Sequence, residues 1–369
     1  MRSSLAATFS RALVRAGGDA LFRYLNRGRL LVVMYHGVTG APFDPPVWTQ
    51  LPQEDFRRQL LFLRDHYRMV GLPEVVAACS GGSLPERAAL VTFDDGLRNN
   101  FTTAFPVLRE LGVPAAVFLP VDLIGTGRIL WFDELYQLIV TAARADLPLA
   151  LPDGAAREEY RAGRAWEAYV LTVEKLKRAG EAARDEVMAT LRRLVPLKRS
   201  DFPADFDLLD WDEAREMQRS GLVGFGVHTA THRILTELGE DALERELLLP
   251  RTRFCRELGH EAEVFCYPNG RPGLDYLPEH QRFLRDCGYR CAFTTENSLF
   301  AWGGGDPLGI GRVAAGNDAS SEENFFRLKT SGALHLRAEA RRLAVRLTRS
   351  LSPETAGQGS KGWGRSWSL

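Results

Sequence analysis

The sequence has few cysteines, and none of the five lies in a CxxC pair. An odd, widely spaced set fits neither a disulfide framework nor a thiolate zinc site, so reducing surroundings are expected. The chain also lacks any apolar run of about 18 residues, which excludes a transmembrane bundle. Lysine plus arginine and aspartate plus glutamate balance at 47 each, so no net positive charge indicates nucleic acid as a partner.

What is present is an ordinary globular composition. Of the 369 residues, 45% are hydrophobic and 25% are charged. These fractions are close to the average of soluble domains and exclude intrinsic disorder for most of the chain. The length allows one large or two ordinary domains with a substantial buried core.

Residues 1–29 form a basic N-terminal segment, expected to be helical, with six arginines and a single acid, Asp19. They contain no apolar core of about 7–15 residues ahead of a small-residue cleavage site, so a secretory signal is not expected. A mitochondrial transit peptide has a similar composition, rich in arginine and serine, and stays open as an alternative. The leading expectation is a cytoplasmic protein.

Apolar runs of strand type alternate with stretches of helical periodicity over most of the chain. Strands are expected at residues 30–35, 67–70, 89–93, 115–119, 223–227, 263–266 and 290–294. Helices are expected between them at 72–78, 99–111, 211–219, 242–258 and 279–287, the fourth with a kink at Pro250. This alternation predicts an α/β fold, with βα units around a parallel sheet or barrel.

The alternation stops between about residue 125 and residue 207. This stretch reads as three helices at 131–145, 166–178 and 182–194, and it predicts a helical insertion 125–207 in a domain of residues 30–320. Residues 321–351 are expected to form a C-terminal helical region that ends in a basic amphipathic helix. The Gly- and Ser-rich residues 352–369 are expected to be disordered.

Two adjacent carboxylates follow a predicted strand in the segment Thr92–Gly96, TFDDG. Adjacent side chains of a strand point to opposite faces, but a turn at Gly96 lets Asp94 and Asp95 face one cleft. A carboxylate bound to a cation stays ionised, while its neighbour is free to take a proton. A surface turn with a helix-capping role is the alternative.

Two histidines follow another predicted strand, in the segment His228–His232, HTATH. Imidazoles at positions i and i+4 of one turn can reach a common metal ion. The helical zinc proteases place a glutamate base between two such histidines, whereas the residues between these two are Thr, Ala and Thr. The base must therefore come from elsewhere, and the two adjacent aspartates are the available source.

Together these segments resemble the first two motifs of the polysaccharide deacetylases of carbohydrate esterase family four. Phe265–Gly270, FCYPNG, looks like a variant of the third motif, and Met34–Val38, MYHGV, resembles the first strand of the Tyr-His-x-Val subgroup. The resemblance covers about residues 30–124 and 208–320. It implies a distorted (β/α)7 barrel and the metal-dependent hydrolysis of an N- or O-acetyl group on a sugar.

Carried over by position, the resemblance implies that Asp95, His228 and His232 hold the metal and that Asp94 is the general base. Two imidazoles and one carboxylate leave positions free on a divalent ion for water and the acyl oxygen. The ion lowers the pKa of the water and polarises the carbonyl group, and the base takes the proton. Zinc (Zn2+) is the expected ion, and nickel, cobalt or iron suit the same ligands.

Several positions depart from the family pattern. Cys266 stands where the third motif usually has an arginine that steadies the base. Arg312 in a late strand is the expected substitute, with a salt bridge elsewhere as its alternative role. Asn269 matches the usual tyrosine whose backbone N–H helps to bind the oxyanion, so Tyr267 and Asn269 are the expected contacts to substrate and oxyanion. His36, at the end of the first strand, is the expected general acid, with a buried structural histidine as the alternative.

The resemblance implies a carbohydrate deacetylase acting on a polysaccharide or a lipid-linked saccharide in envelope or exopolysaccharide biosynthesis. A deformylase or another amide hydrolase acting on an amino sugar is the alternative. Such an enzyme would use the same site residues to cleave a different amide bond. A non-catalytic carbohydrate-binding relative is the third reading. Such relatives usually lose a metal ligand or the base, and all four of those residues are intact here.

The two basic ends of the chain predict contact with a membrane. In residues 1–29 and 334–351, leucine or phenylalanine recurs at helical spacing among arginines. Each arginine near an anionic leaflet contributes about 1 kcal/mol of attraction. Peripheral attachment to the inner face of the cytoplasmic membrane is therefore expected, with packing of both helices on the barrel as the alternative.

Overall fold

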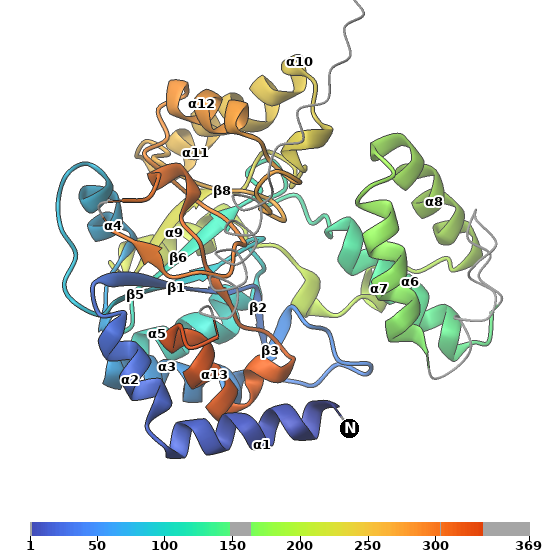
Figure 1. Cartoon of the computed structure of the whole chain (residues 1–369). Helices are drawn as coiled ribbons and strands as arrows, with labels where there is room; N and C mark the ends of the chain where they lie inside the picture. The colour runs from blue at the N-terminus through green and yellow to red at the C-terminus, as the bar shows by residue number, and fades with distance from the viewer. Residues whose placement is uncertain (1, 148–163, 303, 335–369) are drawn as a thin grey trace, which may run out of the picture. The chain divides into compact units, whose positions relative to one another are not determined.

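The structure is a computed structural model, and it describes residues 2–147, 164–302 and 304–334 (Figure 1). Residues 1–333 form one compact unit, to which the described strands and helices belong. The amphipathic helix expected up to residue 351 and the tail of residues 352–369 lie outside the described residues.

A curled sheet of parallel strands forms the centre of this unit. Six strands lie side by side in the order β1 (Arg29–Tyr35), β5 (Ala88–Phe93), β6 (Ala115–Leu119), β7 (Val223–Val227), β8 (Val264–Cys266) and β9 (Cys291–Phe293). A seventh, β11 (Val313–Ala314), pairs in parallel with β1, and Ile310 just before it forms a bridge with Phe293 of β9. The two edges of the sheet meet through this segment, so the predicted distorted (β/α)7 barrel is confirmed.

The distortion lies in the late strands, which are short. Both β8 and β9 have 3 residues, and β11 has 2. The remaining strands are added at the margins: β10 (Phe300–Ala301) is antiparallel to β1, and β4 (Arg68–Met69) is parallel to β5. Directly after His36, β2 (Gly37–Thr39) pairs with β3 (Gln50–Pro52) in a separate small sheet.

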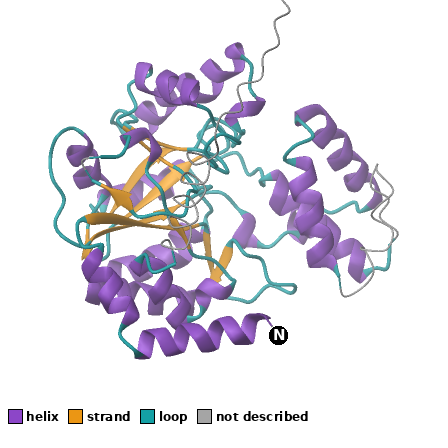
Figure 2. Ribbon diagram, viewed as in Figure 1, coloured by secondary structure: helices purple, strands orange, loops and turns teal. Residues whose placement is uncertain are grey.

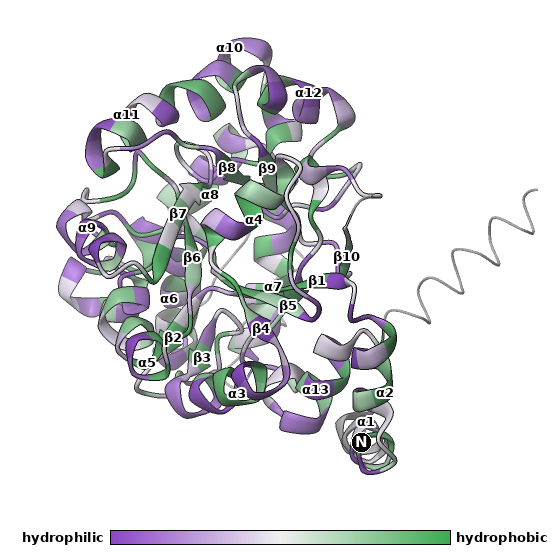
Figure 3. Ribbon diagram, turned by 90° about the vertical axis from the view of Figure 1, so that its left-hand side faces the viewer, coloured by the Kyte–Doolittle hydropathy of each residue, from purple (hydrophilic) through white to green (hydrophobic). Residues whose placement is uncertain are grey.

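Both faces of the strands are buried, which explains why they read as continuous apolar runs. Along β1, Leu31 and Val33 belong to the cluster that also contains Phe56 of α3 (Gln53–His66). The alternate residues Leu30 and Val32 belong to a second cluster, to which α4 (Leu72–Cys79) contributes. Figure 3 shows the strands as mostly hydrophobic and the surrounding helices as two-faced, as the alternation of side chains requires.

Helices surround the sheet (Figure 2), and the outer ones are α3, α5 (Phe105–Leu111), α9 (Trp211–Arg219), α11 (Leu249–Leu258) and α12 (Pro278–Asp286). A π-helical segment, η1 (Asn100–Ala104), precedes α5. The helix expected at 242–258 is divided into α10 (Glu240–Leu243), a π-helical turn η5 (Glu244–Leu248) and α11. Pro250 explains the division, because it lacks an N–H and its ring clashes with the carbonyl four residues earlier. That carbonyl, of Glu246, instead accepts a hydrogen bond from the N–H of Ala230 at 3.1 Å.

The insertion contributes three helices beside the barrel, α6 (Trp131–Arg144), α7 (Ala165–Leu176) and α8 (Glu181–Leu194) (Figure 1). They share an apolar core that includes Leu135, Ile139 and Met188, all fully or almost fully buried. An ion pair of 2.9 Å between Arg233 and Glu181 joins α8 to the loop that follows β7. The insertion therefore packs next to the segment that carries the two predicted metal-binding histidines.

The N-terminal segment forms α1 (Arg2–Arg15) and α2 (Gly18–Leu25), which both pack against α13 (Glu323–Ser331). The buried carboxylate of Asp19 accepts hydrogen bonds from Arg23 at 2.9 Å and from Arg327 at 3.0 Å. This ion pair ties the start of the chain to its last described helix. Within the described ranges, no helix combines the length and the apolarity needed to cross a bilayer.

Candidate active site

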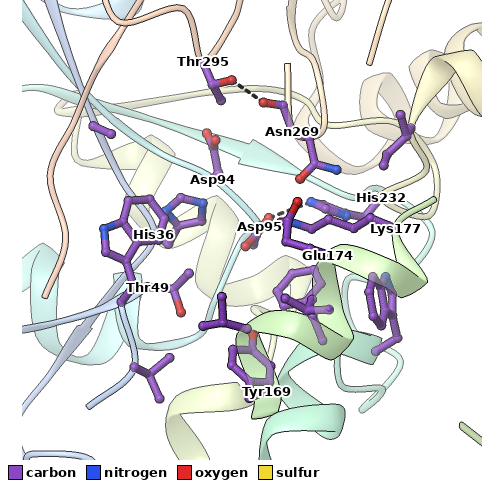
Figure 4. Close-up of a pocket in the computed structure, with 18 of the residues that line it drawn as sticks. His36, Thr49, Asp94, Asp95, Tyr169, Glu174, Lys177, His232, Asn269 and Thr295 are labelled. Atoms are coloured by element: carbon purple, nitrogen blue, oxygen red, sulfur yellow. Dashed lines mark hydrogen bonds and ion pairs between the residues drawn. The ribbon is translucent and has the colours of Figure 1, made fainter. Parts of the chain in front are cut away.

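The carboxyl ends of the parallel strands open into a cavity of about 460 Å³, called here the site cavity. Figure 4 shows side chains from several strand ends pointing into it: His36 after β1, Asp94 and Asp95 after β5, His232 after β7 and Asn269 after β8. In α/β folds this edge of the sheet is where ligands bind.

The two adjacent aspartates reach the same cavity because the backbone turns directly after β5. Asp95 has a φ angle of 72° and Gly96 one of 62°, in the left-handed region that glycine adopts freely and aspartate tolerates. The N–H of Asp94 still donates to the carbonyl of Tyr35 at 3.0 Å, so it continues the pairing of β5 with β1. The turn therefore separates the two residues, and both carboxylates line the cavity.

The structure brings Arg312 to Asp94. Its Nη1 donates to Oδ1 at 2.6 Å and its Nη2 to Oδ2 at 2.8 Å, while its Nε donates to the carbonyl of Thr294 at 2.9 Å. A bidentate pair of this kind fixes the plane of the carboxylate. Burial by itself raises the pKa of Asp94, but the charge and hydrogen bonds of Arg312 outweigh it and lower the pKa below its ordinary value. Asp94 is thus ionised at neutral pH, the state that a general base needs.

The histidine pair lies in a loop rather than on a helix. His228 continues β7, since its N–H donates to the carbonyl of Leu119 at 2.8 Å. Positive φ angles at Thr229 (61°) and His232 (63°) then turn the chain back. Both imidazoles approach Asp95: its Oδ1 lies 3.5 Å from Nε2 of His228 and 3.1 Å from Nε2 of His232.

Asp95, His228 and His232 form a donor set that suits a divalent cation. Oδ1 of Asp95 is buried and accepts no hydrogen bond from any residue that the structure describes, although two imidazole nitrogens lie within hydrogen-bond range. Nδ1 of His228 lies 2.8 Å from the carbonyl of Cys266, which places a ring proton on Nδ1 and leaves Nε2 as the atom that faces Asp95. Two imidazoles and a carboxylate around one point are the ligands of a zinc-type site.

A second group, Asp94, His228 and Cys266, is also compact enough to share a metal, but its chemistry argues against it. Both oxygens of Asp94 already accept hydrogen bonds from Arg312, and the guanidinium repels another cation beside it. Burial raises the pKa of the Cys266 thiol, whereas a cysteine ligand binds as the thiolate. The candidate metal site is therefore the one that contains Asp95.

Two further predicted residues reach the cavity. The ring of His36 packs edge-on against Trp48 with ring centres 5.1 Å apart, and its Nδ1 has no partner in the described part of the chain. Asn269 has a φ angle of 57°, and its carbonyl accepts a hydrogen bond from Thr295 (Figure 4). Among the described residues its N–H has no acceptor, so this donor is available to a ligand.

Tyr267, expected as a contact to substrate, does not reach the cavity. Its ring is fully buried, and its hydroxyl donates to the carbonyl of Leu308 at 2.9 Å. Its N–H donates to the carbonyl of Phe293 at 3.0 Å, in the pairing of β8 with β9. Because both donors of Tyr267 are occupied inside the sheet, this residue belongs to the core.

One wall of the site cavity comes from the insertion, for which the sequence predicted three helices and no role in the site. Trp131 and Phe132 of α6 line the cavity together with Trp166 and Tyr169 of α7. Phe132 contacts His232 directly, with ring centres 5.2 Å apart. Flat aromatic side chains of this kind supply apolar surface for one face of a ligand while keeping a polar edge.

Comparison with known proteins identifies the family to which the chain belongs. A family model described as polysaccharide deacetylase matches residues 81–292, which is more than half of the chain. The chain belongs to the polysaccharide deacetylase family. Among solved structures, the polysaccharide deacetylase BC0361 from Bacillus cereus has the same fold, with a TM-score of 0.52 and 18% identity over 81% of this chain and 69% of that one.

Sequence relatives in this polysaccharide deacetylase family match over shorter stretches. The poly-beta-1,6-N-acetyl-D-glucosamine N-deacetylase of Escherichia coli (strain K12) is 40% identical over 67 residues, 18% of this chain and 10% of that protein. YxkH of Bacillus subtilis (strain 168) is 28% identical over 93 residues, 25% of this chain and 32% of that protein. The chain thus spans about a third or less of the length of these curated relatives.

The polysaccharide deacetylase match contains most of the site but not all of it. Residues 81–292 include both aspartates, both histidines and Asn269, whereas His36 and Arg312 lie outside this range. His36 directly follows β1, and Arg312 directly precedes β11. The two edges of the sheet meet where these two strands pair. Closure of the barrel is therefore what brings them to the family motifs.

Glu246, in the π-helical turn η5, is a residue of the candidate site that sequence reasoning missed. Its buried carboxylate accepts hydrogen bonds from the N–H of Ala230 at 3.0 Å, from the N–H of Thr231 at 2.9 Å and from the hydroxyl of Thr231 at 2.6 Å. It thereby holds the two residues that precede His232. A glutamate in an acidic helix gives no sequence signal of such a role.

Glu246→Ala is expected to weaken the affinity for a divalent metal by about 10- to 100-fold, as loss of groups that orient metal ligands does. Competition with a chelator of known affinity measures the change on folded protein. Glu244→Ala removes an exposed carboxylate from the same turn and should leave the affinity unchanged. Equal affinity in Glu246→Ala and the unaltered protein would show that the loop holds its shape without this residue.

Proposed function

We propose that this polysaccharide deacetylase hydrolyses the acetamido group of an N-acetylated saccharide with the help of a divalent metal held by Asp95, His228 and His232. One observation carries the proposal. An ionised carboxylate, Asp94, held by Arg312, lines the same cavity as a second carboxylate, Asp95, and the two imidazoles that approach it. That is the arrangement of a base next to a metal-polarised acyl group.

A divalent cation bound at these ligands would polarise the acyl oxygen and lower the pKa of the attacking water. Asp94 takes the proton from that water, and Arg312 keeps its carboxylate aimed into the cavity while the charge changes. The free N–H of Asn269 donates to the acyl oxygen as negative charge grows there. His36 gives a proton to the departing nitrogen. Zinc is the proposed ion because the donor set is two imidazoles and one carboxylate.

The test of the function is the release of acetate from N-acetylated glucosamine oligosaccharides by protein loaded with zinc, nickel, cobalt or iron. The substrate is chosen after the activity of the Escherichia coli relative, a poly-beta-1,6-N-acetyl-D-glucosamine N-deacetylase, which supports an exopolysaccharide of N-acetylglucosamine. Lipid-linked and O-acetylated saccharides are the second and third substrates to assay. Formate release from an N-formyl sugar without acetate release from any acetylated substrate would make the chain a deformylase.

His36→Gln is expected to lower turnover while the metal stays bound, because the imidazole supplies a proton and no ligand. Burial lowers the pKa of His36 from its ordinary 6.5 and outweighs the opposing effect of Asp95 and Asp94. The donor is the protonated ring, so the His36-dependent part of the rate should be lost as pH rises through a value below 6.5. Rate profiles over pH for the two proteins check this, and identical profiles would remove His36 from the acid role.

We also propose a location at an anionic membrane surface on the cytoplasmic side. The support is α2, where Leu21, Tyr24 and Leu25 are 56–61% exposed at helical spacing in a segment with six arginines. The exposed apolar side chains of α2, together with the exposed Arg11 and Arg15 of the preceding helix, suit the interface of an anionic leaflet. Co-sedimentation with phosphatidylglycerol vesicles should occur at low salt and fall at high salt. Unchanged binding after Leu21→Ser and Leu25→Ser together would count against this attachment.

A further inference from the structure

A second cavity, of about 490 Å³, lies next to the site cavity. Both cavities are lined by Trp131, Arg184 and His232, so they meet at one of the proposed metal ligands. Its charged lining consists of Arg128, Arg184, Arg192, Arg199 and Arg233 with Glu134, Glu181 and Asp185. This second space is called the arginine cavity below.

The lining of the arginine cavity holds more arginines than acids. Arg192 is matched by Glu134 through two hydrogen bonds of 2.7 Å, and Arg199 pairs with an aspartate outside the cavity, Asp207. Three arginines of the lining, at positions 128, 184 and 233, then face its two remaining acids, Glu181 and Asp185, and Glu237 outside the lining also acts on Arg184 and Arg233. Asp185 is 69% exposed and lies 3.7 Å from Nε of Arg184, so solvent screens most of its effect.

Arg184 and Arg233 each carry a hydrogen-bond donor that no described residue satisfies. The Nε of each is buried and has no acceptor among the residues that the structure describes. Nη2 of Arg233 forms an ion pair with Oε2 of Glu181 at 2.9 Å. Nη2 of Arg184 lies 3.7 Å from Oε1 of the same carboxylate, which is beyond hydrogen-bond range. The guanidinium of Arg184 lies over the ring of Trp131 at 5.3 Å. A buried donor without a partner costs stability, so each such group calls for a ligand or another explanation.

We propose that the arginine cavity binds an anionic group of the substrate, a phosphate or a carboxylate, while the acetylated sugar occupies the site cavity. This inference rests on the proposed function. Because both cavities include His232, the anionic group belongs to the reacting sugar or to its direct neighbour. Guanidinium groups recognise both anions through paired N–H donors. The substrate class is therefore an acidic or phosphorylated N-acetylated saccharide rather than a neutral polymer.

Binding of inorganic phosphate tests the cavity without any turnover. Titration calorimetry should show an affinity at least about 10-fold weaker in Arg184→Gln than in the unaltered protein, as expected for losing a charge-assisted pair. Arg253→Gln is the matched control. Arg253 also lies over a tryptophan, Trp211 at 5.8 Å, contacts an aspartate at 3.2 Å and has an unpartnered Nε, but lines neither cavity. Equal phosphate affinity in all three proteins, or binding in none, would overturn the proposal.

Acetate release from three matched oligosaccharides then identifies the anion. One is neutral, one carries a phosphate monoester and one carries a uronic acid next to the acetylated sugar. The expected result is a lower KM for the phosphorylated or the acidic substrate than for the neutral one. This difference should disappear in Arg184→Gln, and the substrate that shows it identifies the anionic group. Equal KM for all three overturns the anion site and leaves the deacetylase function standing. If no substrate releases acetate, the proposed function fails, and the phosphate titration alone decides the arginine cavity.

Discussion

Asp94→Asn is expected to lower kcat for acetate release by at least about 10²-fold, which is the usual loss when a general base is removed. Asparagine has nearly the same shape and still accepts a hydrogen bond from Arg312, but its amide cannot take a proton. The metal should stay bound, because Asp94 is not among the three proposed ligands. The rate is measured under saturating substrate, and the metal content by elemental analysis.

Stability must be separated from chemistry in this variant, because removing one partner of a buried ion pair costs about 3–5 kcal/mol. Asp19→Asn is the matched control. Asp19 is also buried, with 1% exposure, and accepts hydrogen bonds from two arginines, Arg23 and Arg327, but it belongs to neither site motif. Both variants should lower the melting temperature, and only Asp94→Asn should lower kcat. A folded, metal-loaded Asp94→Asn protein with near-normal kcat would mean that another group takes the proton.

Loss of metal is the second large effect, expected for His228→Ala and for His232→Ala separately. Each removes one of the two imidazoles that lie within 3.5 Å of Asp95, and one carboxylate with one imidazole is too small a set to hold a zinc-type ion against exchange. Elemental analysis after dialysis should find little metal in either protein. Acetate release should fall with the metal content, and added metal in excess should restore it only partly.

His280→Ala is the control for these two variants. His280 is also buried, with 5% exposure, and its Nδ1 accepts a hydrogen bond from the N–H of Leu277 at 3.1 Å, inside the start of α12. Its replacement should lower stability without changing the metal content. Full metal occupancy in His228→Ala or His232→Ala would contradict the assignment of the ligands.

Much of the barrel could be predicted because its strands are buried on both faces. The runs 115–119 and 223–227 coincide with β6 and β7, and 211–219 coincides with α9. Buried strands have continuous apolar sequences, and surface helices show a period of 3.6 residues, so both are visible locally. The helix at 242–258 was predicted as a single kinked element, whereas Pro250 is accommodated by a whole π-helical turn. Which backbone distortion absorbs a proline depends on what takes the freed carbonyl, here the N–H of Ala230.

The site motifs were visible for a similar reason, since Asp94 and His228 each directly follow a strand and Asp95 and His232 lie in the turns just after them. Tyr267 was misplaced because sequence position cannot show which face of a strand or which side of a barrel a residue takes. Glu246 could not be found at all, because its partners Ala230 and Thr231 are distant in sequence.

By itself, the sequence determined the order of strands and helices, the presence of an insertion and the four residues of the two main motifs. Those properties depend on local periodicity, on turn residues and on the chemistry of adjacent side chains. Only the tertiary structure decided that Arg312 pairs with Asp94, that α6 and α7 wall the site cavity and that an arginine cavity adjoins it. These contacts join residues up to 218 positions apart, and their existence depends on how the barrel closes and where the insertion packs, which no local pattern records.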